Sequence, residues 1–368
     1  MAQALESITL EGFAGELLRD GDPGYDEARA VFNAAIDRRP AVIARCTGVA
    51  DVQAALGYAR EQGLPVSVRC GGHSVAGHAV VDGGVMIDVR PINRVRVDPD
   101  QRIAWCGGGA NWAELDRETQ AFGLALTGGR LGDTGVGGLT LGGGSGWLER
   151  KHGFTVDSLI GAEVVTADGR LVVTDEERNP ELLWALKGGG GNFGVVTAME
   201  FKLYPVEQLT GGALLWPAER AEEIFNAWRE WAATVPNQVT SLCRLLNVPP
   251  LPDVPEPLRG RSFVAVEAAI LGDDTPLAPL RALAPEIDMV GPIPPAALIE
   301  IHNDPKQPMP GLADHRVLAD AGPEAIAALV GAAGPADRLF DGYTLHQLRA
   351  VKERVDGGDR FAANHPLA

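Results

Sequence analysis

The residues best suited to chemistry in this sequence lie in glycine-rich clusters, and the first cluster also contains a histidine. It runs from Arg69 to Gly77 as Arg-Cys-Gly-Gly-His-Ser-Val-Ala-Gly, directly after a short apolar segment. Consecutive glycines allow several backbone N–H groups to converge, which makes a nest suited to an anion such as a diphosphate. His73 lies inside this nest. The spacing alone fits a tight turn with an exposed histidine equally well, so both interpretations stay open at this point.

Two further clusters, at residues 128–146 and 187–194, interrupt well-patterned apolar segments. Glycine costs roughly 0.5–1 kcal/mol relative to alanine in regular structure. Loops with this many glycines therefore favour close approach of the backbone to a large flat or phosphorylated ligand. Other nucleotide and hydrolase motifs are missing from the sequence: Gly-Lys-Ser/Thr, His-Glu-x-x-His and an early Rossmann pattern do not occur, and Trp147 breaks a Gly-x-Ser-x-Gly match around Ser145.

Composition excludes several functional classes. The 368 residues carry 49 acidic and 32 basic side chains, for a net charge of −17, which disfavours binding to nucleic acid or to an anionic membrane surface. No apolar run approaches the ~18 residues of a membrane span. The four cysteines lack metal-ligand spacing and do not form a recognisable disulfide framework. With no signal peptide in the sequence, we expect a cytoplasmic protein without a bound metal.

The pattern of apolar residues predicts a layered α/β opening. A helix is expected at 25–39, and a β-α-β unit follows in residues 40–69 with its helix at 48–63. The dipeptide Asp168-Gly169 between two β-rich runs predicts a hairpin, and Asn111 is placed to cap a helix. Further strands are expected at 85–89, 95–97, 103–106, 195–203, 239–248 and 262–270, and further helices at 217–234, 322–331 and 345–361. Glycine loops give way to proline-rich connectors after Pro205, which predicts a second domain from residue 206 onward.

The order of these clusters resembles the FAD-linked oxidases and dehydrogenases of the vanillyl-alcohol oxidase/PCMH superfamily. Within it, the chain is most similar to the berberine-bridge-enzyme-like and 6-hydroxy-D-nicotine-oxidase-like branch. The resemblance covers about residues 25–205 and 345–367. The matching positions are Arg45, 68–73, 82–84, 87–88, 135–138, 142–144, 150–153, 155–157, 165–169, 190–197, 349–352, 359–361 and Asn364.

This resemblance implies an α+β fold with two lobes. The first would be a PCMH-type FAD-binding domain of residues 1–205, completed by residues 345–368. The second would be a smaller antiparallel-sheet substrate or cap domain of residues 206–344. The second domain is short for the family.

The resemblance also implies FAD as the cofactor. The loop at 69–77 would bind the FAD diphosphate, and His73 would be bonded covalently to the 8α carbon of the isoalloxazine. Leu131 occupies the position where many relatives place a second linking cysteine, so a single covalent bond is expected. The expected cofactor-binding residues are Arg69, Cys70, Gly71, Gly72, His73, Ser74, Gly77, Thr134, Gly135, Gly137, Gly138, Leu139, Gly142, His152, Asn192, Val195, Val196 and Asn364.

Within this set, Thr134 takes the position that influences oxygen access in relatives. Asn192, Val195 and Val196 would pack near the adenine or ribitol portion of FAD. The same resemblance implies oxidation of a small organic alcohol, amine or sugar-like substrate by hydride transfer to flavin, with molecular oxygen as acceptor.

No motif marks the catalytic base. Tyr343 is the tyrosine expected nearest the substrate, and Glu300, Asp304 and Asp341 are weaker candidates. The short second domain leaves two alternatives open. The site could be completed by a second subunit of a homo-oligomer, or the chain could be a flavin-binding protein that has lost turnover.

Overall fold

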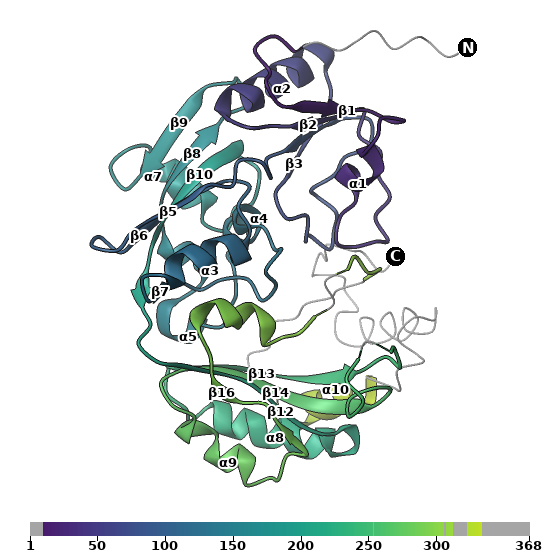
Figure 1. The fold of residues 1–368 in the computed structure, drawn as a ribbon, viewed down its shortest axis with the longest axis vertical. Coiled ribbons are helices and arrows are strands. Elements are labelled where there is room, and N and C mark those ends of the chain that lie inside the picture. The colour runs from purple at the N-terminus through teal and green to yellow at the C-terminus, as the bar shows by residue number, and fades with distance from the viewer. Residues whose placement is uncertain (1–9, 253, 305–306, 312–321, 333–368) are drawn as a thin grey trace. The chain divides into compact units, whose positions relative to one another are not determined.

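The computed structural model describes residues 10–252, 254–304, 307–311 and 322–332 (Figure 1). The chain divides into two compact units. The first consists of the residues up to Glu207 together with Pro294–Gly311, and the second contains Gln208–Ile293 and helix α10 (Pro323–Ala332). The change of unit lies close to the boundary expected at residue 205. Pro294–Gly311, however, clusters with the first unit and not with the second.

The first unit opens with a four-stranded sheet in the order β1-β2-β4-β3. Its strands are β1 (Glu16–Leu18), β2 (Val42–Arg45), β3 (Val66–Arg69) and β4 (Val85–Asp88). Strands β2 and β3 both run parallel to β4. Helix α2 (Val49–Gln62) makes the long connection that parallel strands need, so the predicted β-α-β unit is present with β4 inserted between its two strands.

A five-stranded antiparallel sheet follows, in the order β5-β6-β10-β8-β9. Its strands are β5 (Val95–Asp98), β6 (Ile103–Gly107), β8 (Leu159–Val165), β9 (Leu171–Asp175) and β10 (Val195–Lys202). The predicted hairpin is confirmed, because β8 and β9 pair antiparallel and Gly169 in their turn has φ +85°. Helix α3 (Trp112–Gln120) begins after Asn111, and a capping box with Glu114 confirms the predicted cap.

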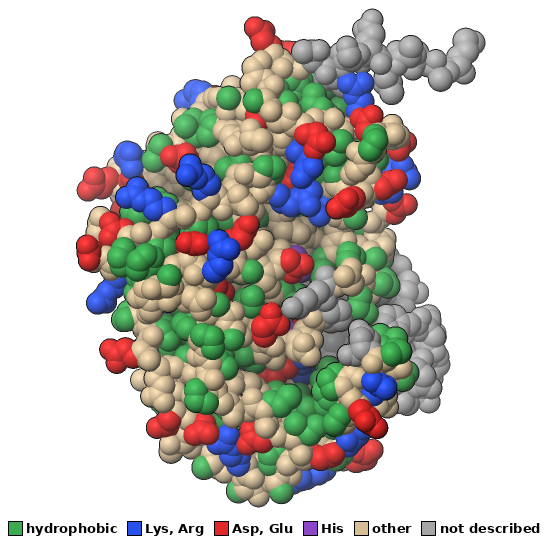
Figure 2. Space-filling view, in the orientation of Figure 1, with side chains coloured by type: hydrophobic (Ala, Val, Ile, Leu, Met, Phe, Trp, Pro, Cys, Tyr) green, Lys and Arg blue, Asp and Glu red, His purple; other side chains and the backbone are tan. Residues whose placement is uncertain are grey.

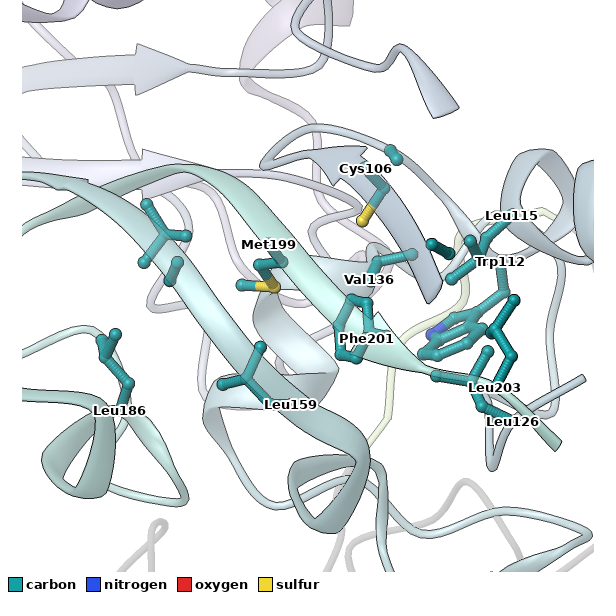
Figure 3. Packing of buried hydrophobic residues seen from close by; sticks show 14 of the residues in the cluster. Cys106, Trp112, Leu115, Leu126, Val136, Leu159, Leu186, Met199, Phe201 and Leu203 are labelled. Atoms are coloured by element: carbon teal, nitrogen blue, oxygen red, sulfur yellow. The ribbon is translucent and has the colours of Figure 1, made fainter. Parts of the chain in front are cut away.

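The main core of the first unit is formed by buried residues of β6, β8 and β10, together with α3, α4 (Val136–Leu141) and α7 (Pro180–Leu186). Figure 3 shows Cys106, Met199 and Phe201 facing this cluster, with Trp112 beside them. Trp112 and Val136 are both completely buried. Because Val136 is the first residue of α4, the core anchors the start of this helix, which lies inside the second glycine cluster.

The remaining elements of the first unit are short. They are α1 (Tyr25–Arg29), β7 (Leu124–Ala125), α5 (Glu149–His152), α6 (Thr155–Ser158), β11 (Tyr204–Pro205) and the 3-10 helix η3 (Pro295–Glu300). The helix expected at 25–39 is therefore wrong beyond residue 29. The chain leaves the helix because the amide of Phe32 donates to the carbonyl of Gly72, a tertiary bond that local periodicity does not reveal.

The second unit is a sheet in the order β13-β14-β12-β15, with β16 also pairing with β12. Its strands are β12 (Leu209–Pro217), β13 (Val239–Asn247), β14 (Ser262–Leu271), β15 (Ile287–Asp288) and β16 (Gly291–Pro292), all antiparallel to their neighbours. Its helices besides α10 are α8 (Ala221–Ala232), α9 (Ala278–Arg281) and the 3-10 turns Ala218–Arg220 and Thr275–Leu277. The antiparallel sheet agrees with the expected fold class.

Strand β12 was missed by the sequence pattern although it lies at the centre of this sheet. Gly211 and Gly212 interrupt its apolar run, and Gly212 has φ +142° and lies directly against the backbone of Met289. On one face of the sheet, Trp216 and Val266 pack with Phe225 of α8 in a continuous core. The second unit therefore has a hydrophobic core of its own.

Charged side chains of both signs are interspersed over the face that Figure 2 shows. Within the described part of the chain, no helix is long and apolar enough to cross a membrane. The same residues contain no group of three or more His, Cys, Asp or Glu side chains arranged to hold a metal ion.

Candidate functional site

The first glycine cluster forms a loop that leaves the carboxyl end of β3. Gly72 has φ +81° and Gly77 has φ +70°, conformations that residues with a Cβ rarely adopt. The two glycines differ in their surroundings. A Cβ on Gly77 would lie 2.7 Å from the side chain of Ile36, whereas Gly72 lies over the guanidinium of Arg69. Gly77 therefore packs the end of the loop against Ile36. The turn from Ser74 to Gly77 is closed by a hydrogen bond of 2.9 Å from the Gly77 amide to the Ser74 carbonyl.

The first and second glycine clusters meet backbone to backbone at Gly71 and Gly135. A Cβ on Gly71 would lie 2.2 Å from the amide nitrogen of Gly135, and a Cβ on Gly135 would lie 2.3 Å from the amide nitrogen of Gly71. The Gly135 Cβ would also lie 2.3 Å from Cys70 Sγ. Only glycine at both positions allows this approach, because real Cβ atoms do not come so close to backbone. The loop that carries His73 is thereby packed directly against the start of α4.

The start of α4 presents a surface without side chains. Gly135, Val136 and Gly137 are buried, whereas Gly138 and Gly142 are exposed. A Cβ on Gly138 would meet no atom within 4 Å, so this glycine is not required by packing within the described protein. Leu139 packs partly against the main core. The exposed strip around Gly138 is open to the close approach of a ligand.

Arg69 supplies buried positive charge beneath the loop. Arg69 is 7 % exposed, and its guanidinium donates a hydrogen bond to the carbonyl of Ala28. Its Nε has no hydrogen-bond partner among the described residues. Burial lowers the pKa of Arg69 to about 10, which still leaves the group charged at neutral pH. Beside it, burial raises the pKa of the Cys70 thiol, so Cys70 is a protonated packing residue.

His73 is held between an aromatic ring and a carboxylate. Its ring stacks on Phe32, with centroids 4.4 Å apart and planes inclined by 22°. Its Nε2 lies 3.1 Å from Oδ1 of Asp133, and the His73 side chain is 15 % exposed. Neither Phe32 nor Asp133 was singled out by the sequence. The only signal for Asp133 was its place in the second glycine cluster, and Phe32 lay in a segment expected to be helical.

Asn33, next to Phe32, forms side-chain hydrogen bonds to three neighbouring segments. Its Nδ2 donates to the carbonyls of Val75 and Gly311 at 2.8 and 3.0 Å, and its Oδ1 accepts the amides of Ala35 and Gly311. The residue is 4 % exposed. Its amide therefore joins the histidine loop to residues 309–311, which the sequence placed in the second domain.

Replacing Asn33 with alanine is expected to lower the free energy of unfolding by about 2–3 kcal/mol, because buried carbonyl and amide groups lose their partners. Denaturant unfolding of the variant and of Asn237→Ala, at an exposed asparagine, measures this difference. Equal unfolding midpoints for the two variants would contradict it.

The other expected contacts lie in varied surroundings. Thr134 is half-buried, and its carbonyl accepts the amide of Trp112. His152 stacks on Tyr204 with centroids 3.9 Å apart, and burial and the nearby Lys151 and Lys202 lower its pKa. Its Nε2 is buried without a partner among the described residues.

The third glycine cluster leads into β10. Asn192 is exposed and its amide closes its own loop on the carbonyl of Gly189 at 2.7 Å. Val195 and Val196 are buried and their side chains join two different hydrophobic clusters. Asn192 is thus a loop residue, and Val195 and Val196 are core residues. Their contact with a cofactor stays a proposal.

Not every glycine of the second cluster is free for a ligand. A Cβ on Gly128 or Gly129 would lie 2.6 or 2.5 Å from the ring of Trp112. These two glycines are therefore required by packing against the buried indole. The sequence interpretation, which assigned the whole cluster to close approach of a ligand, is corrected for these positions.

Among the catalytic candidates, Tyr343 and Asp341 lie outside the described residues, as does the expected cofactor contact Asn364. Glu300 ends η3, and Asp304 Oδ2 lies 3.4 Å from Nε2 of His302. Both belong to the segment that clusters with the first unit.

Comparison with known proteins identifies this region. Residues 40–175, which include β2 to β9 and the contact between Gly71 and Gly135, match the family described as FAD binding domain. This part of the chain is similar to FAD-binding domains. The expected cofactor class is confirmed, and the open strip at Gly138, the buried charge of Arg69 and its unpartnered Nε fit a phosphorylated cofactor.

Individual proteins match over a larger part of the chain. (R)-6-Hydroxynicotine oxidase of Paenarthrobacter nicotinovorans is 38 % identical over 209 residues, which are 56 % of this chain and 46 % of the relative. The crystal structure of 6-hydroxy-D-nicotine oxidase from Arthrobacter nicotinovorans matches with a TM-score of 0.72 and 30 % identity, over 81 % of this chain and 65 % of that one. The fold therefore agrees with the expected vanillyl-alcohol oxidase/PCMH type.

A glucooligosaccharide oxidase from Acremonium strictum matches with a TM-score of 0.63 and 31 % identity, over 72 % of this chain and 54 % of that one. That enzyme carries a 6-S-cysteinyl, 8α-N1-histidyl FAD. The present chain spans about half the length of the curated relatives it matches.

Proposed function

We propose that this chain is an FAD-dependent oxidoreductase whose flavin is bonded to one histidine, His73. The proposed reaction is oxidation of a small organic alcohol, amine or sugar-like substrate by hydride transfer to the flavin, with molecular oxygen as acceptor. The observation that carries the proposal is the contact of Gly71 with Gly135. It joins the histidine loop to the open strip at Gly138 inside an FAD-binding domain.

Different residues of the chain would bind different parts of FAD. The glycine loop at 71–74 offers backbone N–H groups for the FAD diphosphate, and the buried charge of Arg69 lies beneath it. The strip at Gly138 gives the flavin a surface without side chains. His73 provides the imidazole for the covalent bond. When bound, FAD supplies the acceptor for the substrate's hydride, and the protein orients it.

The substrate class rests on the relatives. One is named as an oxidase of 6-hydroxynicotine and another as an oxidase of glucooligosaccharides. The proposal therefore includes both amine-type and sugar-type substrates. Cytoplasmic location and a homo-oligomeric state belong to the same proposal.

Acid precipitation tests the covalent bond. We expect the yellow colour to stay in the pellet of the wild-type protein and to leave with the supernatant of His73→Ala, because alanine has no nucleophile. Absorbance of pellet and supernatant measures the split, and His78→Ala, at an exposed histidine in the same loop, is the matched control. Release of all flavin from the wild type would contradict the covalent assignment, and a protein purified without any flavin would contradict the cofactor.

Turnover separates the oxidoreductase from the alternative of a flavin-binding protein without activity. The holoprotein is photoreduced and then exposed to air, and in a second experiment it is mixed anaerobically with a panel of alcohols, amines and oligosaccharides. Reoxidation by air and bleaching by a substrate are expected. A flavin that no substrate bleaches would favour the inactive binder.

A further inference from the structure

We propose that Asp133 prepares His73 for attachment to the flavin, by holding the imidazole proton on Nε2 and leaving Nδ1 as the nucleophile. The proposal rests on the covalent role of His73 proposed above. Asp133 is a positioning residue in this scheme, because it acts through His73. The contact that carries it is the 3.1 Å distance between His73 Nε2 and Asp133 Oδ1.

A neutral imidazole has one N–H and one nitrogen with a lone pair, and the partner of one nitrogen decides which is which. A carboxylate accepts hydrogen bonds and cannot donate one when ionised. The negative charge of Asp133 Oδ1, 3.1 Å from Nε2, therefore favours the form of His73 with its proton on Nε2. Nδ1 of His73 has no hydrogen-bond partner among the described residues, so its lone pair is available to an incoming carbon.

The surroundings also limit the orientation of the ring. Phe32 covers one face of His73 at 4.4 Å, and Asn33 anchors Phe32 by its four hydrogen bonds to neighbouring backbone. A rotation that exchanged Nδ1 and Nε2 would remove the contact with Asp133. The arrangement thus sets both the tautomer and the direction of the imidazole before any cofactor binds.

Asp133 itself is fixed through its backbone. Its carbonyl lies close to Gly71, where a Cβ would meet it at 2.8 Å, and the contact of Gly71 with Gly135 holds the two loops together. The carboxylate side chain is 55 % exposed. Solvent screens it, so a moderate effect on rate is expected and not an absolute requirement.

The reaction balances with molecular oxygen as the oxidant. One C–H bond of the flavin 8α methyl group and the Nε2–H bond of His73 break, and a bond forms between Nδ1 and the 8α carbon. The two hydrogens and two electrons pass to molecular oxygen, which becomes hydrogen peroxide. As Nδ1 gains its bond to carbon, the ring becomes positive, and the carboxylate of Asp133 stabilises this charge and accepts the Nε2 proton.

Asp133→Asn tests this role with nearly unchanged shape. The purified proteins are incubated with FAD in air, and acid precipitation at increasing times gives the covalently held fraction, while total bound FAD is measured before acid. We expect covalent attachment to slow about two- to fivefold, the range for an exposed charge contact, with total bound FAD unchanged. Asp133→Glu should restore part of the rate, and Asp100→Asn, at an exposed turn, should match the wild type.

Each outcome has a separate meaning. Covalent attachment in Asp133→Asn at the wild-type rate would overturn the role of Asp133 while leaving the covalent bond of His73 intact. A wild type that binds FAD but releases all of it in acid would overturn both. Analysis of the flavin-bearing peptide identifies the bonded nitrogen, and a bond at Nε2 would overturn the assignment of Nδ1.

Discussion

Replacing Gly135 with alanine is expected to destabilise the first unit by about 3 kcal/mol, the upper range for added volume in a packed site. The new Cβ would lie 2.3 Å from both Cys70 Sγ and the amide nitrogen of Gly71. The backbone of the histidine loop cannot yield in the way that the end of a flexible side chain can. The loop must separate from α4, so loss of FAD binding is expected together with loss of stability.

Gly138→Ala is the matched control, three residues further along the same segment. Its Cβ would meet nothing within 4 Å, and the residue lies in α4, where alanine is favoured over glycine by about 1 kcal/mol. The flavin-free protein should therefore be as stable as the wild type or slightly more stable. If FAD approaches this strip as proposed, the added methyl group should weaken FAD binding without weakening the fold.

Denaturant unfolding without FAD and titration with FAD measure the two quantities separately. For Gly135→Ala both the free energy of unfolding and the affinity should fall, whereas for Gly138→Ala only the affinity should fall. Equal stability of the two variants would show that the contact between Gly71 and Gly135 is not important for the fold. Unchanged FAD affinity in Gly138→Ala would place the cofactor elsewhere.

Asp116→Asn is expected to stabilise the protein increasingly as pH rises. Asp116 is 6 % exposed in α3, and burial raises the pKa of its carboxyl from 3.8 to about 8. The folded state therefore keeps a proton that the unfolded state loses above pH ~4. Stability from this group is complete below the unfolded pKa and is lost as pH rises toward about 8.

Asparagine has nearly the same shape and does not titrate in this range. The difference in unfolding free energy between variant and wild type should grow by about 3 kcal/mol from about pH 5 to about pH 8. Urea unfolding at several pH values measures it. Glu118→Gln in the same helix, where the side chain is 43 % exposed, is the control substitution. A difference for Asp116→Asn that does not change with pH would contradict the raised pKa.

The site could be predicted from the sequence as far as its glycine clusters and His73. Which glycines serve a ligand could not be predicted, because glycine is required equally by a buried ring and by a bound cofactor. Gly128 lies against Trp112 and Gly138 lies against open space, although both belong to one cluster. Only the identity of the neighbouring atoms separates the two cases.

The residues that contact His73 could not be predicted from the sequence either. Asp133 and Phe32 are distant from His73 along the chain, and neither carries a motif. Phe32 lies where helical periodicity continued past Arg29, and the hydrogen bond from its amide to Gly72 ends that helix. Similarly, β12 was obscured by Gly211 and Gly212, and its central place follows from pairing with β14 and β15.

Sequence alone was enough to predict the β-α-β opening, the hairpin at Gly169 and the capped start of α3, and a family resemblance added the cofactor class. The three structural elements depend on residues close together in the chain, where periodicity, turn chemistry and capping act locally. The tertiary structure decided which carboxylate faces His73, which segment supports it, and that Pro294–Gly311 joins the first unit. These depend on contacts between segments far apart in the chain, and their geometry is set by the packing of the whole unit.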